Sequence, residues 1–390
     1  MKRFANILFL LILTGALAAV PLATLLSDRP DYSYWENRSL EPFPEITAEG
    51  ILDGSLFQSV ERYFSDHMAG RDRILTLNTR AELELLQKPV VNDQVVTRDV
   101  LLNYHGFGSW DVSWMEAKAQ EIAEELEVLD RQVTDYGGYF LYVGVPQKYC
   151  YFSDRYPDYL DDRRWTMGPA RESFAAALAQ RDIPILEMME VYDGLGRPPE
   201  LYSAVDHHYT YAGALVAYEA LTERLARDTG WELPFCTEGD GLTVRELDNH
   251  YIGSQSRKLY DLWPSRERAG IGELTEPIPF TREDNGVAVE ASLYALPATA
   301  EEDVLYTVYM GGDVAETAIR TDRPELPNAL IVGESFTNAV ETVLWTGFNE
   351  TRSLDLRYYT GGTLAEYIEA WEPDVVICLR DDGSYLTPLA

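Results

Sequence analysis

Short apolar runs without charge alternate with amphipathic segments from about residue 111 to the end of the chain. The run YFLYVGV spans residues 139–145, and similar runs follow at 329–332 and 375–379. Such runs predict strands that are buried on both faces of a sheet. The segments between them, such as 211–227, show the apolar period of helices. Strands that alternate with helices predict an α/β fold, with a mainly parallel sheet and helices on both faces.

The N-terminal segment is strongly apolar. Lys2 and Arg3 precede a stretch from about Phe4 to Leu26 that carries no charge. This arrangement predicts a signal peptide or membrane anchor over residues 1–27, with the rest of the chain outside the cytoplasm. The length of the stretch and Pro21 favour an uncleaved anchor in the cell membrane, whereas cleavage would give a secreted protein. A buried core helix is the alternative, but the segment has no amphipathic pattern.

The remaining chain divides into regions that differ in their sequence pattern. Residues 28–110 begin with a polar, proline-containing stretch and continue with helical periodicity, so we expect a linker and an N-terminal helical region. Residues 111–390 hold the alternating pattern and form the predicted catalytic domain. The alternation stops between about 235 and 324, which predicts an insertion of irregular or antiparallel structure before the strand at 329–332. Within the insertion, LYTVYM carries a strand-like alternation.

The charge balance restricts the partners. The chain has 65 acidic and 32 basic residues and a net charge of −33. Such a charge repels phosphate backbones, which argues against nucleic acid and favours a neutral or weakly charged substrate. Acidity that only keeps the surface soluble is the alternative. Three cysteines without a CxxC pair argue against a zinc site and against a disulfide framework.

One serine stands where a nucleophile would be presented. In ALIVGESF an apolar strand ends at Gly333, and Ser335 follows immediately before a helical segment. In open α/β sheets, ligands bind beyond the carboxyl ends of the strands. The N–H groups at a helix N-terminus, including that of Ser335, would also stabilise an oxyanion. Capping of the helix is the competing use of this serine.

The base that such a serine needs is found in Asp206-His207-His208. Asp206 and His208 are two residues apart, so both side chains can point to one side of an extended or turn segment. Asp206 would orient the imidazole and His208 would face Ser335, as in a Ser-His-Asp triad. Asp206 as a helix cap is the first alternative, and a metal site built on the tandem histidines is the second. No further cluster of ligands completes a metal set, so we expect no metal.

The segment Asp206-His207-His208-Tyr209-Thr210 resembles the signature of the DHHW protein family, with Tyr209 in place of Trp. That family is similar to the periplasmic alginate O-acetyltransferases, which have SGNH-hydrolase-like folds. The order of further motifs supports the resemblance over nearly the whole chain. These motifs are Tyr34-Trp35-Glu36-Asn37-Arg38, Val60-Glu61-Arg62-Tyr63-Phe64, Asp66-His67, Arg71-Asp72-Arg73, Val145-Pro146-Gln147-Lys148, Tyr309-Met310-Gly311-Gly312 and Gly333-Glu334-Ser335-Phe336.

The resemblance implies an SGNH-like fold with Ser335 as nucleophile, His208 as base and Asp206 as orienting carboxylate. His207 falls between the two matched positions and receives no triad role. Glu334 stands where the family usually has Asp, and Tyr209 keeps an aromatic wall but adds a hydroxyl.

Residues around the predicted triad are candidates for binding. Arg357 and Tyr358 lie at the end of a predicted strand at 354–358 and are expected, with Tyr209, to bind a sugar; a solvated Arg over a core Tyr is the alternative. The turn Gly311-Gly312-Asp313 can supply a second oxyanion donor, or be a plain turn.

Together these features predict an exported serine acyltransferase that O-acetylates a cell-surface or secreted polysaccharide through an acyl-serine intermediate, without a cofactor. A carbohydrate esterase and a non-catalytic glycan-binding or assembly protein are the alternatives. The resemblance also implies a membrane-bound acyltransferase as partner.

Overall fold

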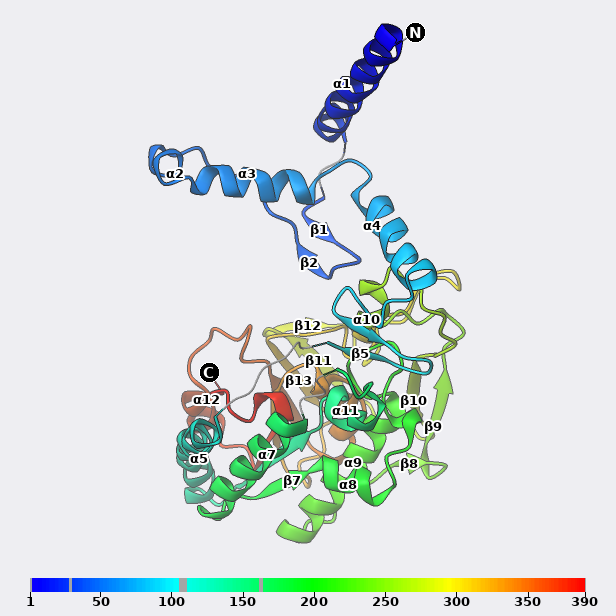
Figure 1. Ribbon diagram of the computed structural model, residues 1–390. Coiled ribbons are helices and arrows are strands. Elements are labelled where there is room, and N and C mark those ends of the chain that lie inside the picture. The colour runs from blue at the N-terminus through cyan, green and yellow to red at the C-terminus, as the bar shows by residue number, and fades with distance from the viewer. Residues whose placement is uncertain (1, 28–29, 105–110, 161–163, 390) are drawn as a thin grey trace. The chain divides into compact units, whose positions relative to one another are not determined.

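The computed structural model describes residues 2–27, 30–104, 111–160 and 164–389 (Figure 1). The chain divides into two compact units. One comprises Met1–Asn92 and Ser256–Pro264, and the other comprises Asp93–Gln255 and Ser265–Ala390. All residues predicted to carry chemistry belong to the second unit.

A mixed sheet forms the centre of the second unit. In the part of the chain that the structure describes, this sheet has eight strands in the order β12-β11-β13-β15-β14-β16-β6-β7. Their bounds are β6 Tyr139–Val145, β7 Ile185–Glu187, β11 Thr281–Asp284, β12 Val287–Val289, β13 Glu316–Arg320, β14 Ala329–Gly333, β15 Glu350–Leu354 and β16 Val375–Asp381. The strands from β15 to β7 pair in parallel, whereas β12, β11 and β13 add to β15 in antiparallel fashion.

The sheet is therefore mixed. The expectation of a mainly parallel sheet holds for the strands from β15 to β7 but not for β12, β11 and β13. The three antiparallel strands come from the stretch 235–324, which was predicted to be an insertion of irregular or antiparallel structure. Strands β11 and β12 join at Asn285 and Gly286, both with positive φ, as a tight hairpin requires. The residues of β12 are all exposed and those of β11 are polar, so neither strand carries the apolar sequence pattern of a buried strand.

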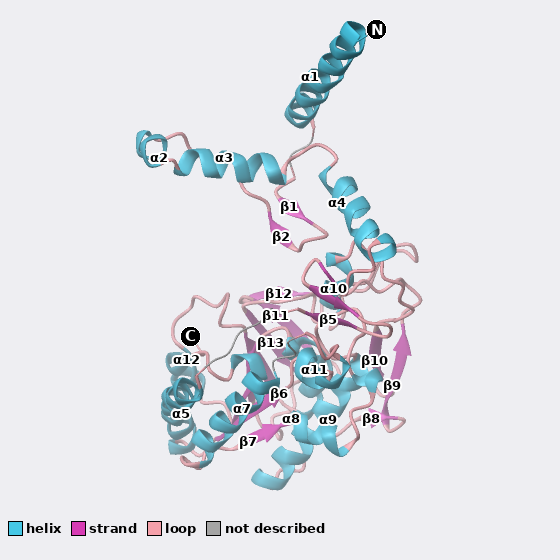
Figure 2. Ribbon diagram, viewed as in Figure 1, coloured by secondary structure: helices cyan, strands magenta, loops and turns pink. Residues whose placement is uncertain are grey.

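Helices cover the parallel strands. The helices of this unit are α5 Val112–Asp135, α6 Lys148–Tyr151, α7 Arg164–Ala179, α8 Met188–Gly194, α9 Tyr211–Thr229, α11 Phe336–Leu344 and α12 Leu364–Trp371. Asp111 caps α5 by accepting a hydrogen bond from the Trp114 N–H. Helix α5 packs against α7 and α12, and α11 packs against α9 (Figure 2).

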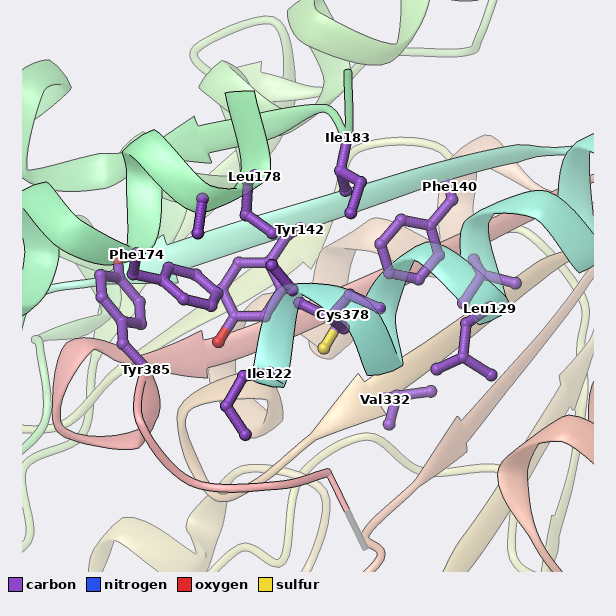
Figure 3. Packing of buried hydrophobic residues seen from close by; sticks show 14 of the residues in the cluster. Ile122, Leu129, Phe140, Tyr142, Phe174, Leu178, Ile183, Val332, Cys378 and Tyr385 are labelled. Carbon is purple, nitrogen blue, oxygen red and sulfur yellow. The ribbon is translucent and has the colours of Figure 1, made fainter. Parts of the chain in front are cut away.

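The main core lies between α5, α7 and the parallel strands. Phe140 and Tyr142 of β6 belong to one buried cluster with side chains of both helices, and Cys378 of β16 is buried in the same cluster (Figure 3). Phe174 of α7 stacks on Tyr385 with ring centroids 4.5 Å apart. Burial of Cys378 as a small apolar side chain agrees with its place in a buried strand.

Smaller elements complete this unit. Strands β8 Thr237–Glu238, β9 Gly241–Glu246 and β10 Gly270–Leu274 form a separate sheet, and β4 Gln94–Val96 pairs with β5 Leu101–Asn103. Two expectations are wrong in detail. LYTVYM is not a strand, because Tyr306–Val308 forms a 3-10 helix, and residues 355–358 follow the end of β15 instead of forming a strand.

The first unit contains short helices and small strands. They are α1 Lys2–Leu26, β1 Tyr32–Ser33, β2 Arg38–Ser39, α2 Ala48–Asp53, α3 Ser55–Asp66, α4 Arg71–Arg80, β3 Val90–Val91 and part of α10 Ser254–Lys258. Arg38 forms a bidentate pair with Asp66 at 2.8 and 2.6 Å, and Arg71 pairs with Glu36 at 2.7 Å. The motif residues of this region thus form an ion-pair network.

The apolar N-terminal segment is helical. Across the described residues, no helix combines the length and apolar character that a membrane crossing needs. The signal peptide or membrane anchor expected over residues 1–27 stays a prediction.

Candidate active site

Ser335 lies at the turn between β14 and α11. It occupies the N-cap position of α11, but its side chain makes no capping hydrogen bond. The residue before the turn, Gly333, packs so closely on β16 that a Cβ would lie 2.3 Å from the Leu379 carbonyl oxygen. The hydroxyl of Ser335 is half-buried and is not used for capping.

His208 and Asp206 lie on the loop that leads into α9. The loop turns back on itself: the Ser203 N–H donates to the His208 carbonyl at 3.2 Å, and Tyr202 bridges to Tyr209. Thr210, not Asp206, caps α9, because its hydroxyl accepts a hydrogen bond from the Gly213 N–H at 3.2 Å. The capping alternative for Asp206 is therefore not what the structure shows.

The structure brings the three predicted residues together. His208 Nε2 lies 2.7 Å from Ser335 Oγ, although the two residues are 127 positions apart in sequence. On the other side of the ring, His208 Nδ1 lies 2.7 Å from Asp206 Oδ1. His208 is 3% exposed and Asp206 1% exposed. Water therefore competes little for these contacts.

The Asp206 carboxylate is held in its charged form. Its Oδ1 also accepts the His208 N–H at 3.1 Å, and its Oδ2 accepts the Ser254 N–H at 2.6 Å. Burial alone would raise the pKa of Asp206, but the nearby imidazoles and these hydrogen bonds outweigh burial and hold the pKa well below its usual range. An ionised, fixed Asp206 can keep the Nδ1 hydrogen on His208, which leaves Nε2 to accept the serine proton.

Aromatic rings fix the plane of His208. Tyr306 stacks on the imidazole with centroids 3.7 Å apart and planes 7° apart, and Phe336 meets it edge-on at 4.7 Å. Tyr306 comes from the segment read as a strand, so the sequence did not point to this role. Its alternating tyrosines were the available signal, but they also fit a strand.

His207 lies beside the triad. Its ring centroid is 3.8 Å from that of His208, and its Nδ1 lies 2.7 Å from Ser254 Oγ. Its side chain is 43% exposed. The structure places His207 next to the triad without placing it between Ser335 and Asp206.

Tyr209 is buried, with 1% of its surface exposed. Its hydroxyl donates a hydrogen bond to the Phe336 carbonyl and so ties the His208 loop to the turn that carries Ser335. It also lines a cavity of about 390 Å³ together with Tyr202, Tyr211 and Glu267. Its contact with a substrate stays a prediction.

Arg357 and Tyr358 lie on the loop after β15. The Arg357 guanidinium donates to Asp355 and, at 2.8 Å, to Asp313, and Tyr358 is 55% exposed. Hydrogen bonding to Asp355 raises the pKa of Arg357 above its usual value. Arg357 also lines a cavity of about 390 Å³ with Glu334, the residue before Ser335. The cavity extends from the Ser335 turn to Arg357, whereas sugar binding there stays a prediction.

The glycine turn approaches the same region. Gly311 and Gly312 have φ values of 82° and 100°, and Gly312 and Asp313 share a small cavity with Gly333 and Asn338. The Gly312 N–H donates to the Tyr309 carbonyl at 3.1 Å, so this N–H serves a turn. The N–H of Ser335 remains the predicted oxyanion donor.

The ligand atoms of Asp206, His207 and His208 lie within 4.8 Å of one another, the spacing that a metal site would need. Each of these side chains already has hydrogen-bond partners in the protein. A Ser-His-Asp cluster whose serine follows the parallel strand β14, and whose His and Asp lie on the loop before α9, is the arrangement that this fold presents. The class of protein that fold and site define is an α/β protein with a serine-centred candidate active site.

Within that class, one known family matches part of the sequence. The family model described as DHHW protein matches residues 36–122, and the resemblance to the DHHW family is confirmed. The matched stretch precedes the DHH segment itself. Among curated proteins, none matches the sequence significantly.

Solved structures share the fold. The structure of Bacillus cereus PatB1 is 18% identical, with 76% of this chain and 98% of that chain covered and a TM-score of 0.64. A DHHW family protein from Eubacterium siraeum DSM 15702 is 16% identical, with 76% and 93% covered and a TM-score of 0.57. The O-acetyltransferase domain of Pseudomonas putida AlgJ is 15% identical, with 75% and 92% covered and a TM-score of 0.46.

Proposed function

We propose that this protein is a serine acyltransferase that moves an acyl group, in the first place acetyl, onto a hydroxyl of a polysaccharide. The observation that carries the proposal is the pair of 2.7 Å contacts that link Ser335 Oγ to His208 Nε2 and His208 Nδ1 to Asp206. A serine hydroxyl is a weak nucleophile at neutral pH and needs such a base.

In the proposed mechanism, His208 Nε2 takes the proton as Ser335 Oγ attacks the carbonyl carbon of an acyl ester. Asp206 stabilises the imidazolium that forms. The developing oxyanion lies near the N-terminus of α11, where the Ser335 N–H can donate to it. The imidazolium then gives its proton to the leaving alcohol, and an acyl-serine remains. A sugar hydroxyl, deprotonated by His208, attacks this ester and releases Ser335.

The choice of substrate rests on weaker support. The sequence resemblance to proteins that O-acetylate alginate favours a glycan acceptor, and the cavity lined by Glu334 and Arg357 offers polar groups on the turn that leads to Ser335. The net charge of −33 favours an acceptor with little charge of its own. Export of the chain, and supply of acyl groups by a membrane-bound acyltransferase, are part of the proposal and follow from the sequence and the resemblance alone.

A second observation supports covalent chemistry at Ser335. A structure of Bacillus cereus PatB1 with a sulfonyl adduct shares the fold of this chain, with 17% sequence identity and a TM-score of 0.63. Sulfonyl halides react with activated hydroxyl groups, so we expect phenylmethanesulfonyl fluoride to label this protein at Ser335.

The test measures release of nitrophenol from p-nitrophenyl acetate, with and without a neutral oligosaccharide acceptor. We expect Ser335→Ala and His208→Ala to abolish release above background. Asp206→Asn should lower it by about 10³- to 10⁴-fold, as loss of the orienting carboxylate does in serine hydrolases. Ser113→Ala, an exposed serine on α5, is the matched control and should keep the wild-type rate.

The acceptor separates transferase from esterase. Mass spectrometry that finds acetylated oligosaccharide identifies transfer, whereas free acetate alone identifies an esterase. Equal nitrophenol release by the wild type and by Ser335→Ala would leave a non-catalytic glycan-binding role and remove the proposal.

A further inference from the structure

The turn Gly253-Ser254-Gln255 contacts the triad from a part of the chain that contributes no triad residue. The Ser254 N–H donates to Asp206 Oδ2 at 2.6 Å, and Ser254 Oγ lies 2.7 Å from His207 Nδ1. The Gln255 N–H donates to the Val205 carbonyl at 3.0 Å. Three consecutive hydrogen bonds thus join this turn to the segment 205–207.

Gly253 allows the turn to lie this close. A Cβ at position 253 would be 2.3 Å from the Val205 carbonyl oxygen and 2.6 Å from the Asp206 nitrogen. Both neighbours are backbone atoms, which cannot swing aside as a flexible side chain can. A glycine is therefore required here by the close approach of two backbones.

The far side of the turn is anchored by buried polar side chains. Lys148 Nζ donates to Gln255 Oε1 at 2.5 Å, and Gln255 Nε2 donates to Asn103 Oδ1 at 2.9 Å. Lys148 is 2% exposed and Gln255 1% exposed. Burial lowers the pKa of Lys148 to about 7, against the opposing charges of Glu267 and Asp206. Buried groups that are satisfied in this way hold one geometry, because each alternative would leave a polar atom without a partner.

We infer that the Gly253–Gln255 turn is a positioning element for the triad: the Ser254 N–H holds Asp206 Oδ2 so that Oδ1 faces His208. The inference rests on the proposed function and extends it to residues that do not touch the substrate. Asp206 Oδ1 alone contacts His208, so a rotation of the carboxylate would break the contact that orients the imidazole. The Ser254 N–H opposes that rotation.

The test uses two substitutions at one position in the full-length protein. Ser254→Pro removes the N–H and puts the ring Cδ where the hydrogen pointed, so it displaces Asp206 Oδ2, which lies 2.6 Å from the nitrogen. Proline is tolerated at the first residue of a helix, where Ser254 begins α10. Ser254→Ala keeps the N–H and removes only the hydroxyl. We expect Ser254→Pro to lower kcat for p-nitrophenyl acetate and the rate of labelling by phenylmethanesulfonyl fluoride about tenfold or more, with KM unchanged. Ser254→Ala should stay within about threefold of the wild type on both measures.

A double-mutant cycle separates positioning from general damage. If the turn acts through Asp206, Ser254→Pro should cost little further activity in an Asp206→Asn background. The inference would be overturned if the activity losses of Ser254→Pro and Asp206→Asn were fully additive, or if Ser254→Pro and the wild type had equal rates. The proposed function is judged separately: it stands as long as the wild type is active and Ser335→Ala is inactive. Should Ser254→Pro fail to fold by circular dichroism, Gln255→Ala, which releases the turn from Lys148 and Asn103, is taken through the same cycle with the same expected pattern.

Discussion

At the scale of single residues, the structure decides between uses that the sequence leaves open. Ser335 stands at an N-cap position but makes no capping bond, and Thr210 caps the helix that Asp206 was considered to cap. Each of these residue types is common at helix starts. Only the positions of the neighbouring side chains show that Ser335 and Asp206 both turn toward His208.

Buried acidic side chains at the ends of the strands make the stability of the protein depend on pH. Burial raises the pKa of Asp382 to about 7, and Asp381, Cys150 and Glu187 face it. Burial likewise raises the pKa of Glu187 to about 7. In the unfolded state the pKa of these carboxyl groups is about 4, so at a pH between about 4 and 7 the folded state binds more protons than the unfolded state. Stability therefore falls as the pH rises from about 4 to about 7.

We expect Asp382→Asn to flatten this fall. The Asn carbonyl can still accept the Gln147 N–H, which Asp382 Oδ1 accepts at 2.9 Å. The variant should gain on the order of 2 kcal/mol over the wild type at pH 8 and little at pH 4.5. Urea unfolding at both pH values measures the difference, with the exposed Asp154→Asn as control. A gain of equal size at both pH values would contradict the assignment to Asp382 ionisation.

At the scale of elements, strand ends determine where the chemistry lies. The strand β14 ends at a glycine that contacts the carbonyl of Leu379 on β16, and the serine follows two residues later. The turn is therefore fixed by two neighbouring parallel strands. A side chain at Gly333 would collide with the Leu379 carbonyl and with Thr337, so the turn that carries Ser335 would have to shift.

Gly333→Ala tests this dependence. A Cβ there would lie 2.3 Å from the Leu379 oxygen and 2.4 Å from Thr337 Cγ2, so we expect a loss of about 1–3 kcal/mol in unfolding free energy. Nitrophenol release should fall with it. Gly168→Ala is the matched control, because no atom lies within 4 Å of its Cβ position in α7. Thermal melting and rate assays of both variants check the prediction, which an unchanged Gly333→Ala protein would contradict.

At the scale of the whole molecule, the excess of acid acts at long range. A net charge of −33 repels polyanions at low salt, and screening shortens this repulsion to about 8–10 Å near physiological ionic strength. The protein's field should therefore discriminate between acceptors before they reach the site.

We expect the rate of transfer to a polyuronate to rise as salt increases from about 20 to 200 mM, a range over which the screening length shortens severalfold. The rate with a neutral oligosaccharide should stay nearly constant. The two acceptors are compared at equal concentration by mass spectrometry of the acetylated product. A polyuronate rate that falls with added salt would point to a local basic patch that outweighs the net charge.

The sequence by itself determined the elements whose signal is local. The strands predicted at 139–145, 329–332 and 375–379 and the serine turn follow from apolar runs, since burial leaves its mark on adjacent positions. Only the tertiary structure decided that β11, β12 and β13 extend the central sheet, that Tyr306 stacks on His208 and that Ser254 contacts Asp206. These depend on which distant segments pack together, and a polar edge strand or a backbone N–H has no distinctive pattern along the chain.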